Sequence, residues 1–267
     1  MSQTEDYLAH SFREVDSGDI NKMMRCLTFM DGLPGFQEYK SAVLEKLDPQ
    51  PGAIIADLGC GLGFDVHRLA ALAGSQGRTL GIDASHALLA KARTESIEPA
   101  AALFLQANIQ RLPLAEASLD ACKVDRTLQH VEKPSAVLNE IFRTLRPGGR
   151  VVCSEPDWST FVIGDQNPVA SRITRFFYQG FRNPRIGSDL EGLLEVAGFV
   201  DLQQQIVVLS TPDFASSDIV FDITQSASRL AASSKSDEPL SWLAGVRQRT
   251  QPLCCSVALV IQFARRP

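Results

Sequence analysis

Short apolar runs alternate with amphipathic segments through the middle of the chain. Runs of strand length occur at residues 53–57, 79–83, 102–106, 119–124 and 150–154. Helical periodicity fills intervals between them at residues 66–73, 84–94 and 134–145. This alternation predicts right-handed βαβ units, and therefore a sheet that begins with five parallel strands.

The two ends of the chain do not follow this alternation of strand and helix patterns. Residues 1–50 read as helices with a break at residues 31–35, and we expect them to fold over the strand ends as a lid. In residues 188–267, strand-like apolar patterns recur at 203–209 and 253–264. Helix-like patterns lie between them at 219–230 and 240–248. This predicts two last strands with a helical insert.

Residues 156–187 are longer than a simple connection between a strand and a helix, and they are rich in aromatic side chains. The aromatic residues are Trp158, Phe161, Phe176, Phe177, Tyr178 and Phe181. Long insertions beside a ligand-binding sheet edge are usually functional, so we interpret this segment as a substrate cap. The alternative is a satellite helix that only adds to the core.

The composition and charge of the chain argue against several classes of protein. The chain has 267 residues, of which 45% are hydrophobic, and a formal net charge of -5, which argues against nucleic acid as a partner. No apolar run approaches the length of a membrane span, and the polar start lacks the features of a secretory signal. We therefore expect a cytoplasmic protein with no membrane association.

Cysteine and histidine placement gives no sign of a metal site. The six cysteines lack CxxC spacing and mostly lie in strand-like segments, and the four histidines are scattered along the chain. This pattern favours reduced thiols in the core over disulfides or zinc, so we expect no structural metal.

A glycine-rich loop directly follows the first predicted strand and precedes a helix. It reads Asp57-Leu58-Gly59-Cys60-Gly61-Leu62-Gly63, and glycines in such a place let backbone N–H groups approach a ligand. Phe64 stands where a dinucleotide fingerprint would carry its third glycine, which disfavours a dehydrogenase. The alternative is an ordinary glycine-rich turn.

Asp83 ends the second predicted strand, at a spacing that suits a ribose-binding acid. A carboxylate there can accept hydrogen bonds from both hydroxyls of an adenosine ribose, although Asp83 can instead cap the next helix. Because the loop and the acid lie at the ends of adjacent strands, together they predict a ligand that contains adenosine.

The order of these segments resembles that of the class I S-adenosylmethionine-dependent methyltransferases, especially the ubiquinone/menaquinone and small-molecule group. Matching segments are residues 57–63, Asp83, 106–113, 119–121, 128–131, 145–149 and 187–199. The resemblance covers about residues 50–210. It implies a Rossmann-like, doubly wound α/β fold with a seven-stranded sheet, mostly parallel with an antiparallel final strand, plus a helical cap.

The resemblance also implies the domain organisation and the cofactor contacts. We expect an N-terminal lid at 1–50, a cofactor-binding core at 51–155, the aromatic cap at 156–187, and the remainder of the core at 188–267. The cofactor is expected to be S-adenosyl-L-methionine, with S-adenosyl-L-homocysteine as product. Its expected contacts are Asp57, Gly59, Cys60, Gly61, Gly63, Asp83, Ala84, Asn108, Ile109 and Asp125.

Two places depart from the family pattern. Asn108 stands where the family commonly has an aspartate, and we interpret it as a tolerated change in an adenine contact, the alternative being a turn asparagine. Asp125 and Arg126 lie where related enzymes often carry small or neutral residues. They are expected to contact the cofactor or the substrate, or to pair with each other.

Three charged or titratable residues are the catalytic candidates: His130, Arg126 and Asp125. His130 is the candidate base because imidazole titrates near neutral pH, and the alternative is a residue that only orients or caps. Arg126 or Asp125 can instead bind the acceptor. Substrate contacts are expected from His130, Trp158, Phe161, Phe177 and Tyr178, whose rings would form an apolar wall.

These observations predict a methyltransferase that acts on an oxygen or carbon atom of a small hydrophobic metabolite, in secondary or quinone-like metabolism such as natural product biosynthesis. A second hypothesis keeps the cofactor but makes the protein a cyclase or isomerase without methyl transfer. A third is a non-catalytic binding protein that has kept the pocket. Only a small-molecule partner is expected, and the chain is predicted to be a monomer or a homodimer.

Overall fold

The strands form one continuous sheet. The computed structural model describes residues 16, 18–94 and 102–267. Within them seven strands pair in the order β3-β2-β1-β4-β5-β7-β6. Strand β7 is antiparallel to both of its neighbours, whereas the other pairings are parallel. The predicted Rossmann-like fold class is therefore confirmed.

The first half of the sheet forms where the apolar runs predicted it. The strands are β1 (Ile54–Leu58), β2 (Arg78–Asp83), β3 (Ala102–Gln106) and β4 (Leu119–Asp125). The helices between and after them are α4 (Phe64–Ala73), α5 (His86–Thr94) and α6 (Pro134–Thr144). Both residues 57 and 58 of β1 are buried, so this strand delivers the glycine loop from a fixed position inside the core.

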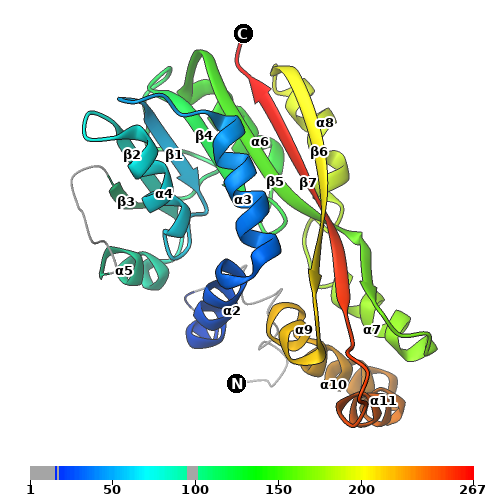
Figure 1. Ribbon diagram of the computed structural model, residues 1–267. Helices are drawn as coiled ribbons and strands as arrows, with labels where there is room; N and C mark the ends of the chain where they lie inside the picture. Colours follow the sequence, from blue (N-terminus) through cyan, green and yellow to red (C-terminus); the bar gives the residue numbers. More distant parts are fainter. Residues whose placement is uncertain (1–15, 17, 95–101) are drawn as a thin grey trace.

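The last three strands are much longer and bend away from this half (Figure 1). They are β5 (Leu145–Ile163), β6 (Val200–Thr211) and β7 (Cys255–Arg265). The predicted fifth strand was too short, because β5 continues through Pro156 and pairs with β7 as far as Ile163 and Cys255. The start of the predicted aromatic cap is therefore part of the sheet.

Helices collect at the far ends of these long strands (Figure 1). They are α7 (Pro168–Tyr178), α9 (Phe214–Phe221), α10 (Ile223–Ser234) and α11 (Glu238–Arg247), while α8 (Ile186–Val196) packs on the sheet. The helix expected over 219–230 is divided between α9 and α10. The division falls at Asp222, whose φ of +51° interrupts the helical path.

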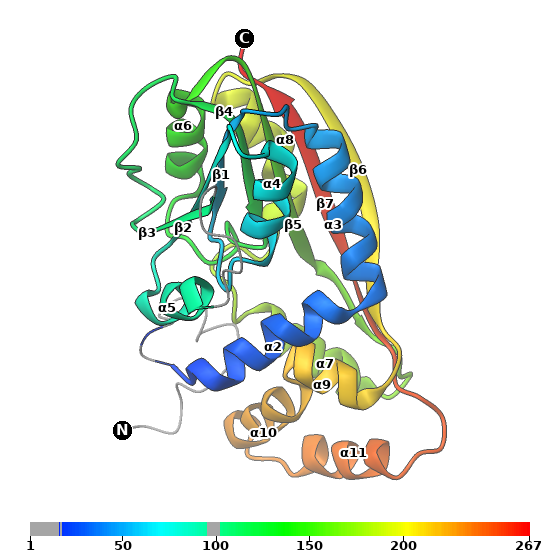
Figure 2. The same ribbon diagram turned by 60° about the vertical axis from the view of Figure 1, so that its left-hand side comes forward.

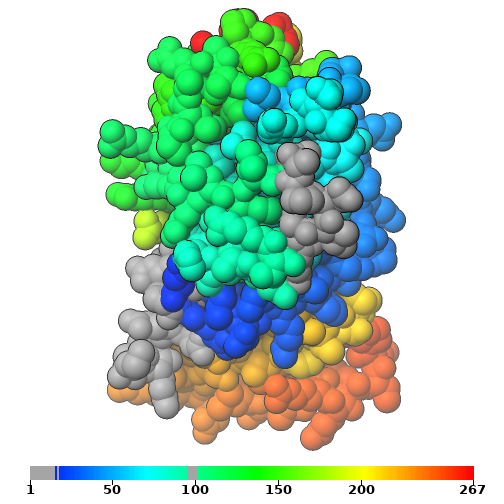
Figure 3. Space-filling view, turned by 90° about the vertical axis from the view of Figure 1, so that its left-hand side faces the viewer, coloured from blue at the N-terminus to red at the C-terminus, as the bar shows by residue number. Residues whose placement is uncertain are grey.

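Two N-terminal helices link the halves of the molecule. These are α2 (Ile20–Gly32) and α3 (Pro34–Leu47), so the predicted break falls where Pro34 begins a new helix. Helix α3 runs along the sheet, and α2 crosses between α5 and the C-terminal helices (Figure 2). In Figure 3, α2 is the blue band between the core above and those helices below. Residues 1–15 and 17 of the expected lid, including the polar start, lie outside the described residues.

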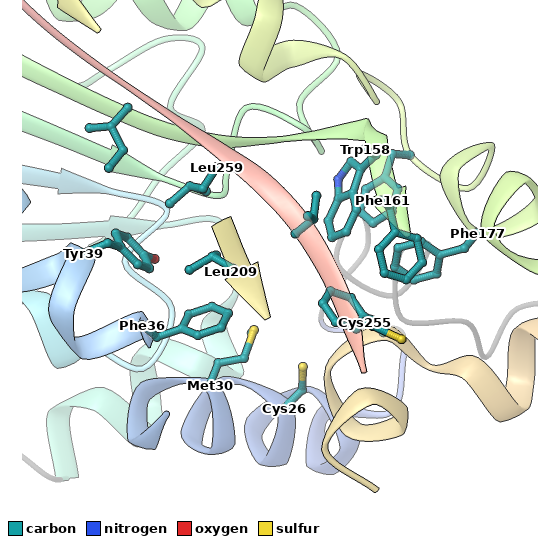
Figure 4. Close-up of a cluster of buried hydrophobic side chains, with 14 of the residues drawn as sticks. Cys26, Met30, Phe36, Tyr39, Trp158, Phe161, Phe177, Leu209, Cys255 and Leu259 are labelled. Atoms are coloured by element: carbon teal, nitrogen blue, oxygen red, sulfur yellow. The ribbon is translucent and has the colours of Figure 1, made fainter. Parts of the chain in front are cut away.

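Two apolar clusters hold the fold, one on each side of the sheet. One contains the side chains of α6 and α8, and the other joins α2 and α3 to the aromatic residues near the far ends of β5 and β7 (Figure 4). Among the described residues, no helix is both long and apolar enough to cross a membrane.

Candidate active site

A cavity of about 840 Å³ lies at the carboxyl ends of the central strands. This is the edge at which open α/β sheets bind ligands. The lining comes from the loops after β1, β2, β3 and β4, from α2 and α3, and from the aromatic segment. Residues from each region that the sequence predicted to be functional therefore line the same cavity.

The glycines of the loop after β1 have different roles. Gly59, Gly61 and Gly63 all have positive φ, at +73°, +53° and +77°. A Cβ atom on Gly59 would lie 2.2 Å from Thr127 Oγ1, and one on Gly63 would lie 2.7 Å from the Phe104 ring. A Cβ atom on Gly61 would meet only Leu27, at 3.5 Å. Gly59 and Gly63 are thus required for packing, whereas Gly61 keeps the cavity open.

Asp83 fastens this loop to the end of β2. Its Oδ2 accepts the Gly61 N–H at 2.8 Å and its Oδ1 accepts the Ser85 N–H at 2.8 Å. The start of α5 is instead capped by Asp16, which accepts from the N–H groups of His86 and Ala87. Burial raises the pKa of Asp83 against these hydrogen bonds.

The Asp83 carboxylate retains acceptor capacity on the cavity side. A carboxylate has about four lone-pair positions, and the two backbone donors use two of them. Asp83 and Ala84 both line the cavity. The residues present here therefore fit a ligand with ribose hydroxyls, beside an open space at Gly61.

Asn108 lies on the same wall, next to Ile109. Its Oδ1 accepts the Gln110 N–H at 2.9 Å, which is the turn arrangement considered as the alternative. Gln110 Nε2 also approaches this oxygen, but at 3.4 Å the contact is long, so the second lone pair can still accept from a ligand. Asp57, Gly59, Cys60 and Gly61 also line the cavity, whereas Gly63 does not.

A buried lysine lies beneath the glycine loop. Lys123 is in β4, and its side chain is 2% exposed. Its Nζ lies 2.8 Å from Asp65, 3.4 Å from Asp57 and 3.5 Å from Asp125. Sequence reasoning missed Lys123, although a lysine within an apolar strand is a signal of a buried ion pair.

The ion pairs continue into the N-terminal helices. Asp31 of α2 accepts from Lys40 of α3 at 3.1 Å and from Arg68 of α4 at 2.8 Å. We call the connected set the ion network; it consists of Asp31, Asp57, Asp65, Asp125, Lys40, Arg68, Lys123 and Arg126. It joins α2 and α3 to the floor of the cavity.

Electrostatics within the ion network favour charged groups despite their burial. Desolvation alone would raise the pKa of Asp65, but Lys123 and Lys40 hold it well below its usual range. The pKa of Asp125 is likewise lowered by Lys123 and Arg126 against desolvation. Asp57 is different, because desolvation outweighs Lys123 and raises its pKa to about 6.

Asp125 and Arg126 end β4 and pair with each other, as one of the two interpretations expected. Arg126 Nε donates to Asp125 at 3.3 Å, and the Tyr39 hydroxyl donates to the same carboxylate at 3.0 Å. The guanidinium lies over the Phe36 ring, 5.2 Å from its centroid, with Nη1 3.1 Å from the Met30 sulfur. Both charged residues still line the cavity.

The loop after β4 is held by a second buried acid, Glu155 of β5. It accepts backbone N–H groups from Thr127 at 2.7 Å, Leu128 at 2.6 Å and Gln129 at 3.3 Å. Burial raises the pKa of Glu155 to about 8, although these three donors oppose the shift. Sequence reasoning missed this contact because it joins two strands whose pairing the sequence does not specify.

Gln129 connects this loop to the aromatic segment. Its Nε2 donates to the Arg126 carbonyl at 2.8 Å, and its Oε1 accepts from Trp158 Nε1 at 2.6 Å. His130 follows it and also lines the cavity, with its ring 5.8 Å from that of Phe181. One short loop therefore positions Arg126, His130 and the Trp158 indole.

The expected aromatic wall is present in part (Figure 4). Trp158 and Phe177 line the cavity, together with Phe181 and Phe221, which were not among the named candidates. Trp158 stacks on Phe181 with centroids 4.4 Å apart. Of the other expected contacts, Phe161 is buried against Phe177 with centroids 5.0 Å apart, and Tyr178 packs against the core; neither lines the cavity.

Within the described ranges, no group of three or more His, Cys, Asp or Glu side chains is arranged to hold a metal ion.

The sheet order and the glycine loop after β1 define a Rossmann-like α/β fold, with its cavity at the edge where such folds bind ligands. Residues 56–153 match a protein-family model described as "Methyltransferase domain". This segment of the chain is therefore similar to a methyltransferase domain.

Two relatives each match 61% of the chain. A stretch of 167 residues, 61% of this chain, is 42% identical to an "Uncharacterized 37.1 kDa protein in transposon TN4556" of Streptomyces fradiae and covers 48% of it. A demethylmenaquinone methyltransferase of Lactococcus lactis is 31% identical over 164 residues, which are 61% of this chain and 63% of that protein. The chain thus spans about half to three-fifths of these relatives.

A putative methyltransferase of Bacillus halodurans has a similar fold. Its crystal structure superposes with a TM-score of 0.64 at 15% identity, covering 85% of this chain and 98% of that one.

Proposed function

We propose that this protein transfers a methyl group from S-adenosyl-L-methionine to an oxygen or carbon atom of a small hydrophobic metabolite. One observation carries the proposal: a single cavity joins the glycine loop and Asp83 to an aromatic wall, with His130 also on its lining. A cofactor-sized site beside an apolar space is the arrangement that group transfer to an apolar acceptor needs.

The cofactor half of the cavity is assigned to the residues at the ends of β1, β2 and β3. Gly61 leaves room for the ligand, Asp83 accepts from ribose hydroxyls, and Asn108 with Ile109 borders the adenine. Asp125 lies beside the methionine part, where its carboxylate stabilises positive charge. When bound, the cofactor supplies a methyl group on a sulfonium, which is already strongly electrophilic.

The residues of the chain then mainly align the acceptor and exclude water. Trp158, Phe177, Phe181 and Phe221 provide the apolar surface on which a flat acceptor packs. His130 holds the reacting group of the acceptor or removes its proton. Its position after β4 puts it on the acceptor side of Asp83 in this proposal.

A pair of histidine variants tests this assignment. We expect His130→Ala to lower methyl-transfer turnover more than it lowers affinity for S-adenosylhomocysteine, while His86→Ala, at an exposed site on α5, leaves both unchanged. A loss of about 10²–10⁴-fold with removal of the acidic limb of the pH profile would indicate a base, and a loss below about tenfold would indicate positioning. Full turnover in His130→Ala would exclude both roles.

The reaction class is tested with labelled S-adenosylmethionine and a panel of apolar acceptors. Appearance of label in the acceptor supports methyl transfer. Cofactor binding with conversion of an acceptor but no label in it would support a cyclase or isomerase instead. Absence of S-adenosylhomocysteine binding by calorimetry would overturn the proposal as a whole.

The proposed setting is secondary or quinone-like metabolism in the cytoplasm, including natural product biosynthesis, with the chain acting as a monomer or a homodimer. The likeness to a demethylmenaquinone methyltransferase supports the choice of a hydrophobic acceptor.

A further inference from the structure

Arg126 is a cation whose hydrogen-bonding capacity is only partly used by the protein. A guanidinium has five N–H donors in a planar fork. Nε donates to Asp125, and Nη1 points at the thioether of Met30, which is a weak acceptor. Within the part of the chain that the structure describes, Nη2 makes no hydrogen bond. The side chain is only 18% exposed and lines the cavity, so water cannot fully replace these bonds.

The backbone holds Arg126 in a conformation that a non-glycine residue seldom adopts. Its φ is +51°. Its N–H donates to the Ser154 carbonyl at 2.7 Å, and its own carbonyl accepts from Gln129 at 2.8 Å. Strained residues of this kind are concentrated at functional sites. The conformation is therefore imposed by the surroundings, which fix where the side chain leaves the backbone.

The ion network carries no net charge that would oppose the binding of an acidic group in the cavity. The ion network has four carboxylates and four cations among the described residues, so it is neutral when all are ionised. S-adenosylmethionine has a sulfonium, an ammonium and a carboxylate, and therefore adds one positive charge. Asp83 and Glu132 also line the cavity outside the ion network, so the electrostatic argument for an anionic acceptor is local and depends on the Arg126 guanidinium and the positive charge of the cofactor.

We propose that Arg126 binds a carboxylate on the acceptor, so that the substrate class of this site is aromatic or polycyclic acids. The apolar part of such an acid would pack on Trp158 and on Phe181, which stacks on Trp158. Gln129 links the Trp158 indole to the Arg126 carbonyl by two hydrogen bonds. This inference rests on the proposed methyl-transfer function and adds the chemistry of the acceptor to it.

The test compares acids with neutral molecules of the same shape. The probes are the carboxylates and the matched carboxamides of benzene, naphthalene and phenanthrene. Binding is measured by calorimetry with the enzyme saturated by sinefungin, a cofactor analogue that carries an amine in place of the sulfonium centre. We expect the wild type to bind at least one acid about tenfold or more tightly than its amide, the scale of a charge-assisted hydrogen bond.

Two arginine variants separate the role of Arg126 from general charge. In Arg126→Gln the preference for the acid should fall to about one, and Arg126→Lys should restore only part of it because lysine lacks the planar fork. Arg182→Gln is the matched control, because Arg182 is an exposed arginine on the lining of the same cavity. No acid preference in the wild type on any of the three scaffolds overturns the proposal, and so does a preference that persists in Arg126→Gln.

A further arm distinguishes the acceptor from the cofactor as the source of the carboxylate. S-adenosylhomocysteine has the amino-acid carboxylate, and 5′-methylthioadenosine lacks it. We expect Arg126→Gln to change the affinity for the two by less than about threefold. A loss of tenfold or more for S-adenosylhomocysteine alone would assign Arg126 to the cofactor and overturn the proposal. Normal S-adenosylhomocysteine binding without acid preference leaves the methyltransferase proposal standing, whereas loss of cofactor binding in the wild type removes both.

Discussion

At the scale of single residues, the floor of the cavity depends on one buried cation. Lys123 lies among Asp57, Asp65 and Asp125, and its own pKa is raised well above the usual value by these carboxylates against desolvation. Removing one partner of a buried ion pair costs more than the pair contributes, because the remaining charges stay buried. Lys123 is therefore the residue at which the ion network can be tested most directly.

We expect Lys123→Met to lower the free energy of unfolding by about 3–5 kcal/mol at pH 7. The loss should be smaller at pH 5. Without the cation, the pKa values of the three acids rise in the folded protein, so the folded state takes up protons that the unfolded state does not, and its stability increases as the pH falls. Denaturant unfolding at both pH values measures this. Lys91→Met, at an exposed site on α5, is the control, and equal losses at both pH values would contradict the explanation.

The glycine loop provides a matched pair of alanine variants. Both Gly61→Ala and Gly59→Ala place a side chain at positive φ, which costs about 1–2 kcal/mol. Only Gly59→Ala adds an overlap with Thr127, so it should lower the unfolding temperature clearly more than Gly61→Ala does. Gly61→Ala should remain folded but lose about tenfold or more of its affinity for S-adenosylhomocysteine. Normal binding by folded Gly61→Ala would remove this glycine from the cofactor site.

At the scale of elements, the loop after β4 is positioned by β5 through Glu155. The pKa of this acid is raised from 4.5 to about 8, so between these values the folded state binds more protons than the unfolded state. Stability must therefore fall as the pH rises through this range, by up to about 1.4 kcal/mol per pH unit for one group. The folded state as a whole would thus be less stable in alkaline solution, although the ionised carboxylate is the better acceptor for the N–H groups of the loop.

Comparison with Glu155→Gln isolates this contribution. We expect the difference in unfolding free energy, wild type minus variant, to decrease steadily from pH 5 to pH 8, because glutamine does not titrate. Denaturant unfolding at unit steps of pH gives both curves, and Glu191→Gln, at an exposed site on α8, should run parallel to the wild type. Parallel curves for Glu155→Gln would show that the carboxylate is ionised throughout and that its three N–H donors outweigh burial.

The success of sequence interpretation also differs between elements. The early strands and α3 to α6 were predicted because their patterns are local: an apolar run such as β1, or Pro34 at a helix start. The continuation of β5 through Pro156 was not, because it depends on pairing with β7 about a hundred residues later. The same reason explains the site. Asp83 and the glycine loop follow from motifs, whereas Glu155, Gln129 and Tyr39 act through contacts between distant segments.

At the scale of the whole molecule, β7 joins two parts of the sheet that do not otherwise pair. It lies between β5 and β6 and forms ladders with both, from Cys255 to Arg265. The segment that matches the methyltransferase family, residues 56–153, lies entirely before it in sequence. The matched segment therefore does not contain all that the sheet needs.

We expect a chain that ends at residue 250 to show no cooperative unfolding transition, because β5 and β6 would both present unpaired edges. Addition of a peptide of residues 251–267 should restore a cooperative transition in a concentration-dependent way. Circular dichroism during thermal unfolding measures both, with the full chain as control. Cooperative unfolding of the shortened chain by itself would show that β7 is dispensable for the fold.

The position of β7 also has a consequence during synthesis. A ribosome delivers β5 and β6 before β7, so the emerging chain carries two edges and the apolar face between them until the final strand leaves the exit tunnel. The wall formed by Trp158 and Phe221 belongs to the apolar cluster that contains Val257 and Leu259 of β7, and it is incomplete during this interval. The aromatic half of the cavity is thus completed only after β7 has been made, and it remains exposed to chaperones until then.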